Sequence, residues 1–105
     1  MPIFYVQFEA LPNPGSHDFK EFGGAYVNCW VSASSETQAK DIARKSIGEA
    51  QWHVVAVEEE VREVNEQYYS ENIEGLEHYE QALLDGECYV FHRWPNEAQD
   101  QDALH

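Results

Sequence analysis

Four residues whose side chains can ligate metals or act as nucleophiles lie in segments expected to form strands: Cys29, His53, Cys88 and His92. Cys88 and His92 share one strand face, but their spacing of four residues places them roughly 13 Å apart. One tetrahedral metal cannot join ligands at that distance unless other strands supply the rest. A zinc site from Cys29, His53 and His92 is one alternative, and histidines that form hydrogen bonds at the ends of a core are the other. We expect no metal and no cofactor.

A cysteine–histidine nucleophile pair is a second chemistry that these residue types allow. Cys88 lies beside Glu87, and a nearby carboxylate raises the pKa of a thiol, which opposes its reactivity. The chain contains no Gly-x-Gly-x-x-Gly, no Walker loop, no Cys-x-x-Cys and no His-Glu-x-x-His. Two cysteines are too few for a disulfide scaffold, so we expect free thiols in a reducing compartment. We therefore expect no catalytic residue, and we favour a protein that is not an enzyme.

The charge of the chain excludes several classes of partner. The 105 residues include 6 Lys plus Arg and 20 Asp plus Glu, for a formal charge of −14. This balance opposes binding to nucleic acid or to anionic lipid, both of which require cationic side chains. We find no apolar run long enough to span a bilayer and no basic segment of a signal peptide, so we expect a cytoplasmic protein. Most of the charge lies in residues 58–105, whose only bases are Arg62 and Arg93.

Hydrophobic periodicity predicts four strands and two helices. The strands are expected at residues 3–8, 25–33, 52–57 (continuing to about 63) and 87–94. The 52–57 strand is apolar on both faces, which is typical of a central strand. A long loop is expected over residues 11–24, which contain two prolines and a pair of glycines.

The first helix is expected to begin at Ser35, where Gln38 completes a capping box, and to end at Gly48. The second is expected over residues 70–85, with Ser70 as its N-cap and Gly86 as its end. Its apolar arc spans about 140° at 100° per residue. The arc consists of Ile73, Leu76, Tyr79, Leu83 and Leu84.

This order of elements, β-β-α-β-α-β, predicts an α+β fold in the form of a two-layer sandwich. We expect a mixed sheet of about four strands with two helices on one face, ferredoxin-like in outline. The strand–helix–strand segment implies a parallel crossover. Residues 1–94 are expected to form one domain, and residues 95–105 an acidic, disordered tail.

Residues 26–43, YVNCWVSASSETQAKDIA, combine a strand that ends in Ala-x-Ser with a capped helix that carries Glu-x-x-Ala-x-x-x-Ala. A tryptophan-containing strand follows. This unit, over residues 25–57, resembles a pattern in small uncharacterised bacterial proteins. The resemblance implies a bacterial, cytoplasmic α+β domain, and it carries no catalytic residue.

Our main functional hypothesis is a protein-binding or regulatory module whose acidic half meets a basic protein, with charge steering the encounter. Aromatic side chains beside the acids would anchor the complex. Acids that serve only solubility are an equal alternative. The proposed steering residues are Glu71, Glu74 and Glu77, and the proposed anchors are Tyr68, Tyr69 and Tyr79.

A second hypothesis is a small-ligand-binding protein or an enzyme, with a pocket between the sheet and the 11–24 loop. His17, His53 or His92 would then supply acid–base groups. A third is a structural homodimer, because a sheet with helices on one side leaves another face to cover. The sequence therefore predicts a protein partner, a second copy of the chain, or both.

Overall fold

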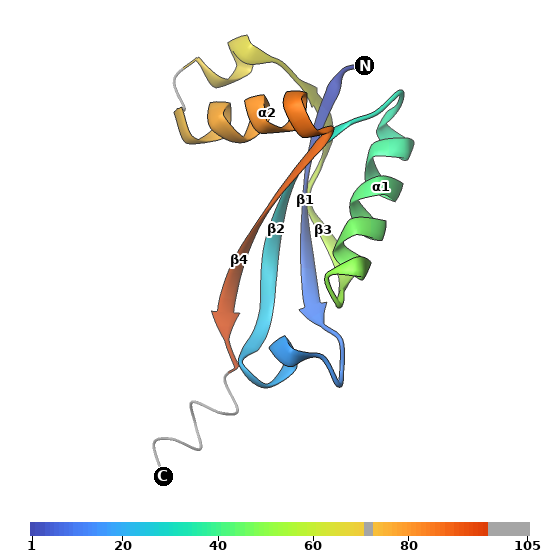
Figure 1. Cartoon of the computed structure of the whole chain (residues 1–105), viewed down its shortest axis with the longest axis vertical. Coiled ribbons are helices and arrows are strands. Elements are labelled where there is room, and N and C mark those ends of the chain that lie inside the picture. The colour runs from blue at the N-terminus through green and yellow to red at the C-terminus, as the bar shows by residue number, and fades with distance from the viewer. Residues whose placement is uncertain (71–72, 97–105) are drawn as a thin grey trace.

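The computed structural model describes residues 1–70 and 73–96. In this part of the chain, four strands form one sheet and two helices pack against it, so the predicted α+β class and element order are confirmed (Figure 1). The strands are β1 (Ile3–Pro12), β2 (Phe22–Ser32), β3 (Trp52–Val64) and β4 (Glu87–Pro95). The helices are α1 (Glu36–Glu49) and α2 (Ile73–Asp85), with short 3₁₀ helices η1 (His17–Lys20) and η2 (Glu66–Tyr69).

The sheet has the strand order β3-β1-β2-β4, and every neighbouring pair is antiparallel. The prediction of a mixed sheet is therefore wrong, and this is not the classic ferredoxin order. β2 and β3 run in the same direction, as the crossover through α1 requires, but β1 separates them. β3 is an edge strand rather than a central one, and Val55 and Val57 are 48% and 36% exposed.

The two helices cover opposite faces of the sheet, so the prediction of helices on one face is wrong. Ala43 and Ile47 of α1 pack in one buried cluster with alternate residues of β1, among them Phe4 and Val6. α2 contributes to a second cluster with the intervening β1 residues, Ile3 and Tyr5. Because successive side chains of a strand point to opposite faces, the two clusters lie on opposite sides of the sheet. Figure 1 shows α1 and α2 on different sides of the strands.

Three β-bulges distinguish β3 from its partner β1. β3 has 13 residues and β1 has 10, and the pairing shifts by one residue at three places. Each bulge adds a residue to β3 that has no counterpart on β1. Bulges reverse the alternation of inward and outward side chains, so a simple period of two does not describe this strand.

The predicted capping residue is confirmed at the start of α1 and is wrong at its end. The Ser35 hydroxyl accepts a hydrogen bond from the Gln38 N–H at 3.1 Å, which confirms the predicted N-cap. Gly48 lies inside α1 instead of ending it, and the chain reverses at Gln51, whose φ is 69°. Ser70 is likewise not the N-cap of α2, because it follows η2 and α2 begins at Ile73.

The buried side of α2 differs from the predicted apolar arc. Ala82 is fully buried, and Leu76 and Tyr79 pack beside it, whereas Leu83 and Leu84 are 55% and 81% exposed. The buried side of α2 is therefore turned from the predicted arc toward Ala82, and Leu83 and Leu84 face solvent near the end of the helix. α2 ends at Gly86 as predicted, with a left-handed φ of 89°.

The loop between β1 and β2 is shorter than the predicted 11–24 segment, because β1 continues to Pro12 and β2 begins at Phe22. η1 in this loop closes the end of the core, where Asp18 accepts a 2.9 Å hydrogen bond from the buried Trp52 indole. Among the described helices, none is long and apolar enough to cross a membrane. Of the predicted tail over residues 95–105, Pro95 belongs to β4, and residues 97–105 lie outside the described residues.

Candidate functional site

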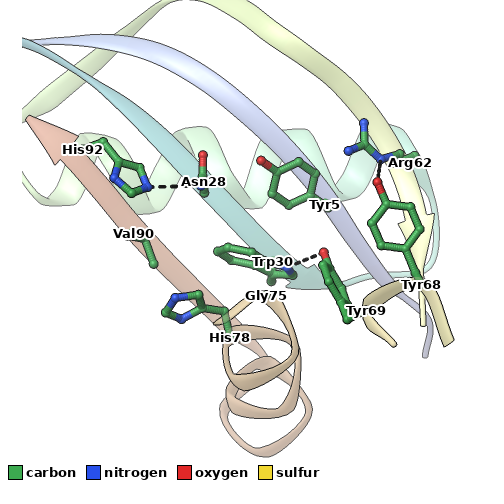
Figure 2. Close-up of a pocket in the computed structure, with 10 residues that line it drawn as sticks. All are labelled: Tyr5, Asn28, Trp30, Arg62, Tyr68, Tyr69, Gly75, His78, Val90 and His92. Carbon is green, nitrogen blue, oxygen red and sulfur yellow. Dashed lines mark hydrogen bonds between the residues drawn. The ribbon is translucent and has the colours of Figure 1, made fainter. Parts of the chain in front are cut away.

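A cavity of about 300 Å³ opens on the sheet face that carries α2 (Figure 2). Its volume is at the low end of the range for small-molecule sites. β1, β2, β3 and β4 each contribute side chains to it, and η2 and α2 enclose one side. We call it the aromatic cavity; it is lined by Tyr5, Asn28, Trp30, Arg62, Tyr68, Tyr69, Gly75, His78, Val90 and His92.

Trp30 joins the sheet to η2 in this cavity. Its indole N–H donates a 2.7 Å hydrogen bond to the hydroxyl of Tyr69, and both side chains are buried. The ring of Tyr5 lies 5.2 Å from the Trp30 ring, and Tyr68 meets Tyr69 edge-on at 4.9 Å. Aromatic pairs at these separations stabilise one another beyond simple burial. The rings therefore form a rigid aromatic wall of the cavity.

Arg62 lies between two of the tyrosine rings. Its guanidinium carbon is 5.0 Å from the centre of the Tyr5 ring and 5.4 Å from that of Tyr68, within range for cation–π attraction. Its Nε donates to the Tyr68 hydroxyl at 2.9 Å, and its Nη2 lies 3.4 Å from the carboxylate of Glu59. These contacts hold the guanidinium at the cavity wall while using two of its five N–H groups.

Tyr5 is also held in place by Glu59, because its hydroxyl donates to that carboxylate at 3.2 Å. Burial first, and the nearby Glu59 charge second, raise the pKa of Tyr5 well above its ordinary value. Tyr5 therefore stays neutral and hydrogen-bonded throughout the physiological range.

The opposite side of the cavity is polar. The Asn28 amide nitrogen lies 3.2 Å from Nε2 of His92, and its Oδ1 accepts a 2.7 Å hydrogen bond from Gln7. These bonds orient the Asn28 amide across the sheet. His78 stands on α2, with its ring 4.9 Å from that of Trp30. Figure 2 shows Arg62 and His92 at opposite ends, with Tyr5 and Trp30 between them.

The charge of this lining differs from that of the whole chain. Among its described residues, one is arginine, two are histidine and none carries a carboxylate, whereas 20 of the 105 residues in the chain are acidic. Glu59 contacts Arg62 and Tyr5 without lining the cavity itself. An anion here would meet cationic or neutral donors.

Cys88 and His78 form the cysteine–histidine pair that the residue types allow. The sulfur lies 3.8 Å from Nδ1 of His78. Burial, and then the nearby Asp85 carboxylate, raise the pKa of the Cys88 thiol. The thiol is therefore protonated near neutral pH, whereas nucleophilic catalysis requires the thiolate. This geometry supports a binding site rather than a nucleophilic one.

The structure does not bring Cys29, His53 and His92 together. Cys29 is fully buried on the α1 side of the sheet, where burial raises its pKa, and His92 lines the cavity on the α2 side. His53 forms a 2.7 Å hydrogen bond with Asn13 near the start of β3. Within the described part of the chain, no three His, Cys, Asp or Glu side chains are grouped as metal ligands.

The three histidines of the predicted pocket are also separated. His17 is exposed on η1 and lines neither cavity, and His92 belongs to the aromatic cavity. His53 lines a second cavity, of about 390 Å³, beside the predicted 11–24 loop. Its other lining residues are Leu11, Pro12, Pro14, Phe19, Phe22, Gly23 and Asn96.

The residues predicted to bind a protein are only partly described. Glu71 lies outside the described residues, as does the side chain of Glu74, while Glu77 is exposed on α2. The three predicted aromatic anchors, Tyr68, Tyr69 and Tyr79, have different environments: the first is 51% exposed, the second is buried and the third packs against the α2-side cluster. The steering role of these acids stays a prediction.

Sequence reasoning missed Arg62, Tyr5 and His78 as site residues. Arg62 carried one available signal, because it is one of only two bases in residues 58–105. Tyr5 alternates with core residues on an apolar strand, and nothing in its pattern separates it from them. Comparison of the chain with models of protein families, with curated proteins and with solved structures found no match.

Proposed function

We propose that this protein binds a small, flat organic anion in the aromatic cavity. One observation carries the proposal: in a chain of charge −14, the described lining combines an arginine, two histidines and four aromatic rings without a carboxylate. Acidic residues are abundant elsewhere, so a lining without them favours an anionic ligand over a cationic one. Arg62 also occupies the faces of Tyr5 and Tyr68, which a cationic ligand would need.

The aromatic rings and the polar groups would have separate roles. The flat body of the ligand would lie along the aromatic wall to which Trp30 and Tyr5 belong, because neighbouring contacts already fix these rings. Its carboxylate would accept charge-assisted hydrogen bonds from the N–H groups of Arg62 that Tyr68 and Glu59 do not use. Asn28 and His92 would bond polar atoms at the other end.

Calorimetric titration of the full chain with 1-naphthoate tests this proposal, with 1-naphthamide as the neutral probe of the same shape. We expect heat of binding with the carboxylate and much weaker binding of the amide. The Arg62→Gln variant should bind 1-naphthoate about tenfold or more weakly, because a charge-assisted hydrogen bond is lost.

Arg44→Gln is the matched control. Arg44 lies on α1 over the ring of Phe8, on the other side of the sheet, and the substitution removes the same charge. We expect this variant to bind like the unmodified chain. If Arg62→Gln and Arg44→Gln weaken binding of 1-naphthoate equally, the loss of affinity comes from net charge and not from the cavity. If 1-naphthoate and 1-naphthamide bind equally well, the cavity is not an anion site.

A further inference from the structure

The two edges of the sheet differ in how well they are protected from pairing with another strand. β3, at one edge, carries three bulges and the acidic run Glu58–Glu60. Bulges and charged side chains are the common devices that keep an edge strand from adding a neighbour. β4, at the other edge, has one register shift, near its end, and no carboxylate from Cys88 to Asn96.

Two hydrogen bonds show which backbone groups of β4 point away from the sheet. The Ser32 N–H donates to the Gly86 carbonyl at 2.8 Å, and the Asn96 N–H donates to the Glu21 carbonyl at 3.2 Å. In an antiparallel pair, residues alternate between bonding their neighbour and pointing away from it. Even-numbered residues here therefore bond β2. The residues that present N–H and C=O groups outward are Glu87, Tyr89, Phe91 and Arg93.

We propose that a second copy of this chain pairs with β4, antiparallel, about a two-fold axis at Val90. This register uses all four outward-facing residues, and each facing pair exchanges two hydrogen bonds. Glu87 lies opposite Arg93 of the partner subunit, and Tyr89 lies opposite Phe91 of the partner subunit. The two sheets then form one continuous sheet.

Charge complementarity favours a second copy as the occupant. In this register, Glu87 faces Arg93 of the partner subunit on each side of the axis, so two oppositely charged pairs form across the strands. Arg93 lies over the ring of Phe91, at 5.1 Å, on the sheet face that Glu87 shares. The acidic remainder of each chain opposes association, and β4, which carries no carboxylate after Glu87, is where that repulsion is least.

Pairing would also extend one wall of the aromatic cavity. Val90 and His92 of β4 line that cavity, and this register places Cys88 of the partner subunit opposite His92. The pairing itself depends on no ligand, so its test is separate from the test of ligand binding.

Sedimentation velocity of the unliganded full chain, over a series of concentrations, measures this association. Physiological ionic strength is used, because its Debye length of about 8 Å screens repulsion between distant acids more than interactions between directly facing side chains. We expect a monomer–dimer equilibrium whose dissociation constant rises about tenfold in Arg93→Glu and in Glu87→Arg, because each places like charges opposite one another. The double variant restores opposite charges and should recover the original constant.

Two further variants complete the test. Lys45→Glu makes the same charge change on an exposed position of α1 and should leave the dimer intact. Arg93→Pro removes an outward N–H without removing a bond to β2, and should abolish the dimer while the circular dichroism of the fold persists. If Glu87→Arg fails to fold because it loses the 2.6 Å hydrogen bond from Ser46, Arg93→Pro still tests the pairing. A monomer at every concentration, a dimer that persists in folded Arg93→Pro, or a double variant that stays weak would overturn the proposal.

Discussion

Glu59 and Arg62 lie three residues apart on β3, yet their side chains emerge on the same face of the sheet and meet at 3.4 Å. In a regular strand, an odd spacing places two side chains on opposite faces. The register shift between Tyr5 and Gln7 adds a residue to β3 between them, so Arg62 pairs with Tyr5 and Glu59 with Gln7. The bulge therefore places the cation and the carboxylate that holds it beside the same tyrosine.

The position of Arg62 predicts that Arg62→Lys destabilises the protein although the charge is kept. Lysine loses the planar stacking on Tyr5 and Tyr68 and the Nε bond to the Tyr68 hydroxyl. We expect a loss of about 1 kcal/mol in the free energy of unfolding, because the side chain is partly solvent-exposed. Urea denaturation measures it. Arg44→Lys, over the single ring of Phe8, is the control and should cost less.

The Trp30–Tyr69 hydrogen bond predicts that loss of the Tyr69 hydroxyl lowers stability more than loss of the Tyr68 hydroxyl. Tyr69→Phe leaves the buried Trp30 indole N–H without its acceptor, which should cost about 1–3 kcal/mol of stability. Tyr68→Phe removes the hydroxyl of a half-exposed ring and should cost less. Equal urea midpoints for the two variants would show that the buried bond contributes nothing specific.

Most of the elements could be predicted from the sequence, and their arrangement could not. Ser35 and Gly86 marked helix ends because capping and left-handed glycine act locally. The faces of the sheet depend on contacts between distant segments. Residues 52–57 look like a central strand because they are apolar, but in an edge strand with bulges some of those side chains face solvent, as Val55 does.

Alanine substitutions at Gly24 and Gly48 are expected to change stability in opposite directions. In Gly24→Ala, the new methyl group would overlap the ring of Trp94, whose Cε2 lies 2.8 Å from the position that the Cβ would occupy. The indole must therefore move from its contact with Tyr26. We expect a loss of about 1–3 kcal/mol. Gly48→Ala lies in α1, where no atom outside the local helix backbone lies within 4 Å of the new methyl group, and should stabilise the chain by about 0.5–1 kcal/mol. Thermal unfolding of the two variants checks both signs.

Buried phenols predict how stability changes at alkaline pH. Burial is the first cause that raises the pKa of Tyr5, of Tyr69 and of Tyr89. Groups with a raised pKa in the folded state stabilise it fully below their unfolded pKa of about 10, and this contribution is lost as pH rises through the folded value. We expect the free energy of unfolding to fall above about pH 10, near the pKa of a phenol in the unfolded chain. The fall should be less steep in Tyr5→Phe. Denaturation at several alkaline pH values measures the slopes, and identical slopes would exclude Tyr5 as a contributor.

The aromatic cavity could be predicted only in part. The sequence indicates Tyr68 and Tyr69 as aromatic residues beside acids, and His92 as a polar residue on a strand. Their convergence with Arg62 depends on a bulge in β3 and on η2 packing against the sheet. Neither feature has a local signature in residues 58–70. A site assembled from four strands, η2 and α2 requires the tertiary structure.

The most direct test of the account is an NMR titration of the tryptophan indole N–H signals with 1-naphthoate. The chain has three tryptophans, and only Trp30 lines the aromatic cavity. The Trp52 indole bonds Asp18 at the far end of the core, so it serves as an internal control. We predict that the Trp30 signal shifts in a saturable manner while the Trp52 signal stays in place. An unchanged Trp30 signal at saturating 1-naphthoate would contradict an anion-binding site in this cavity.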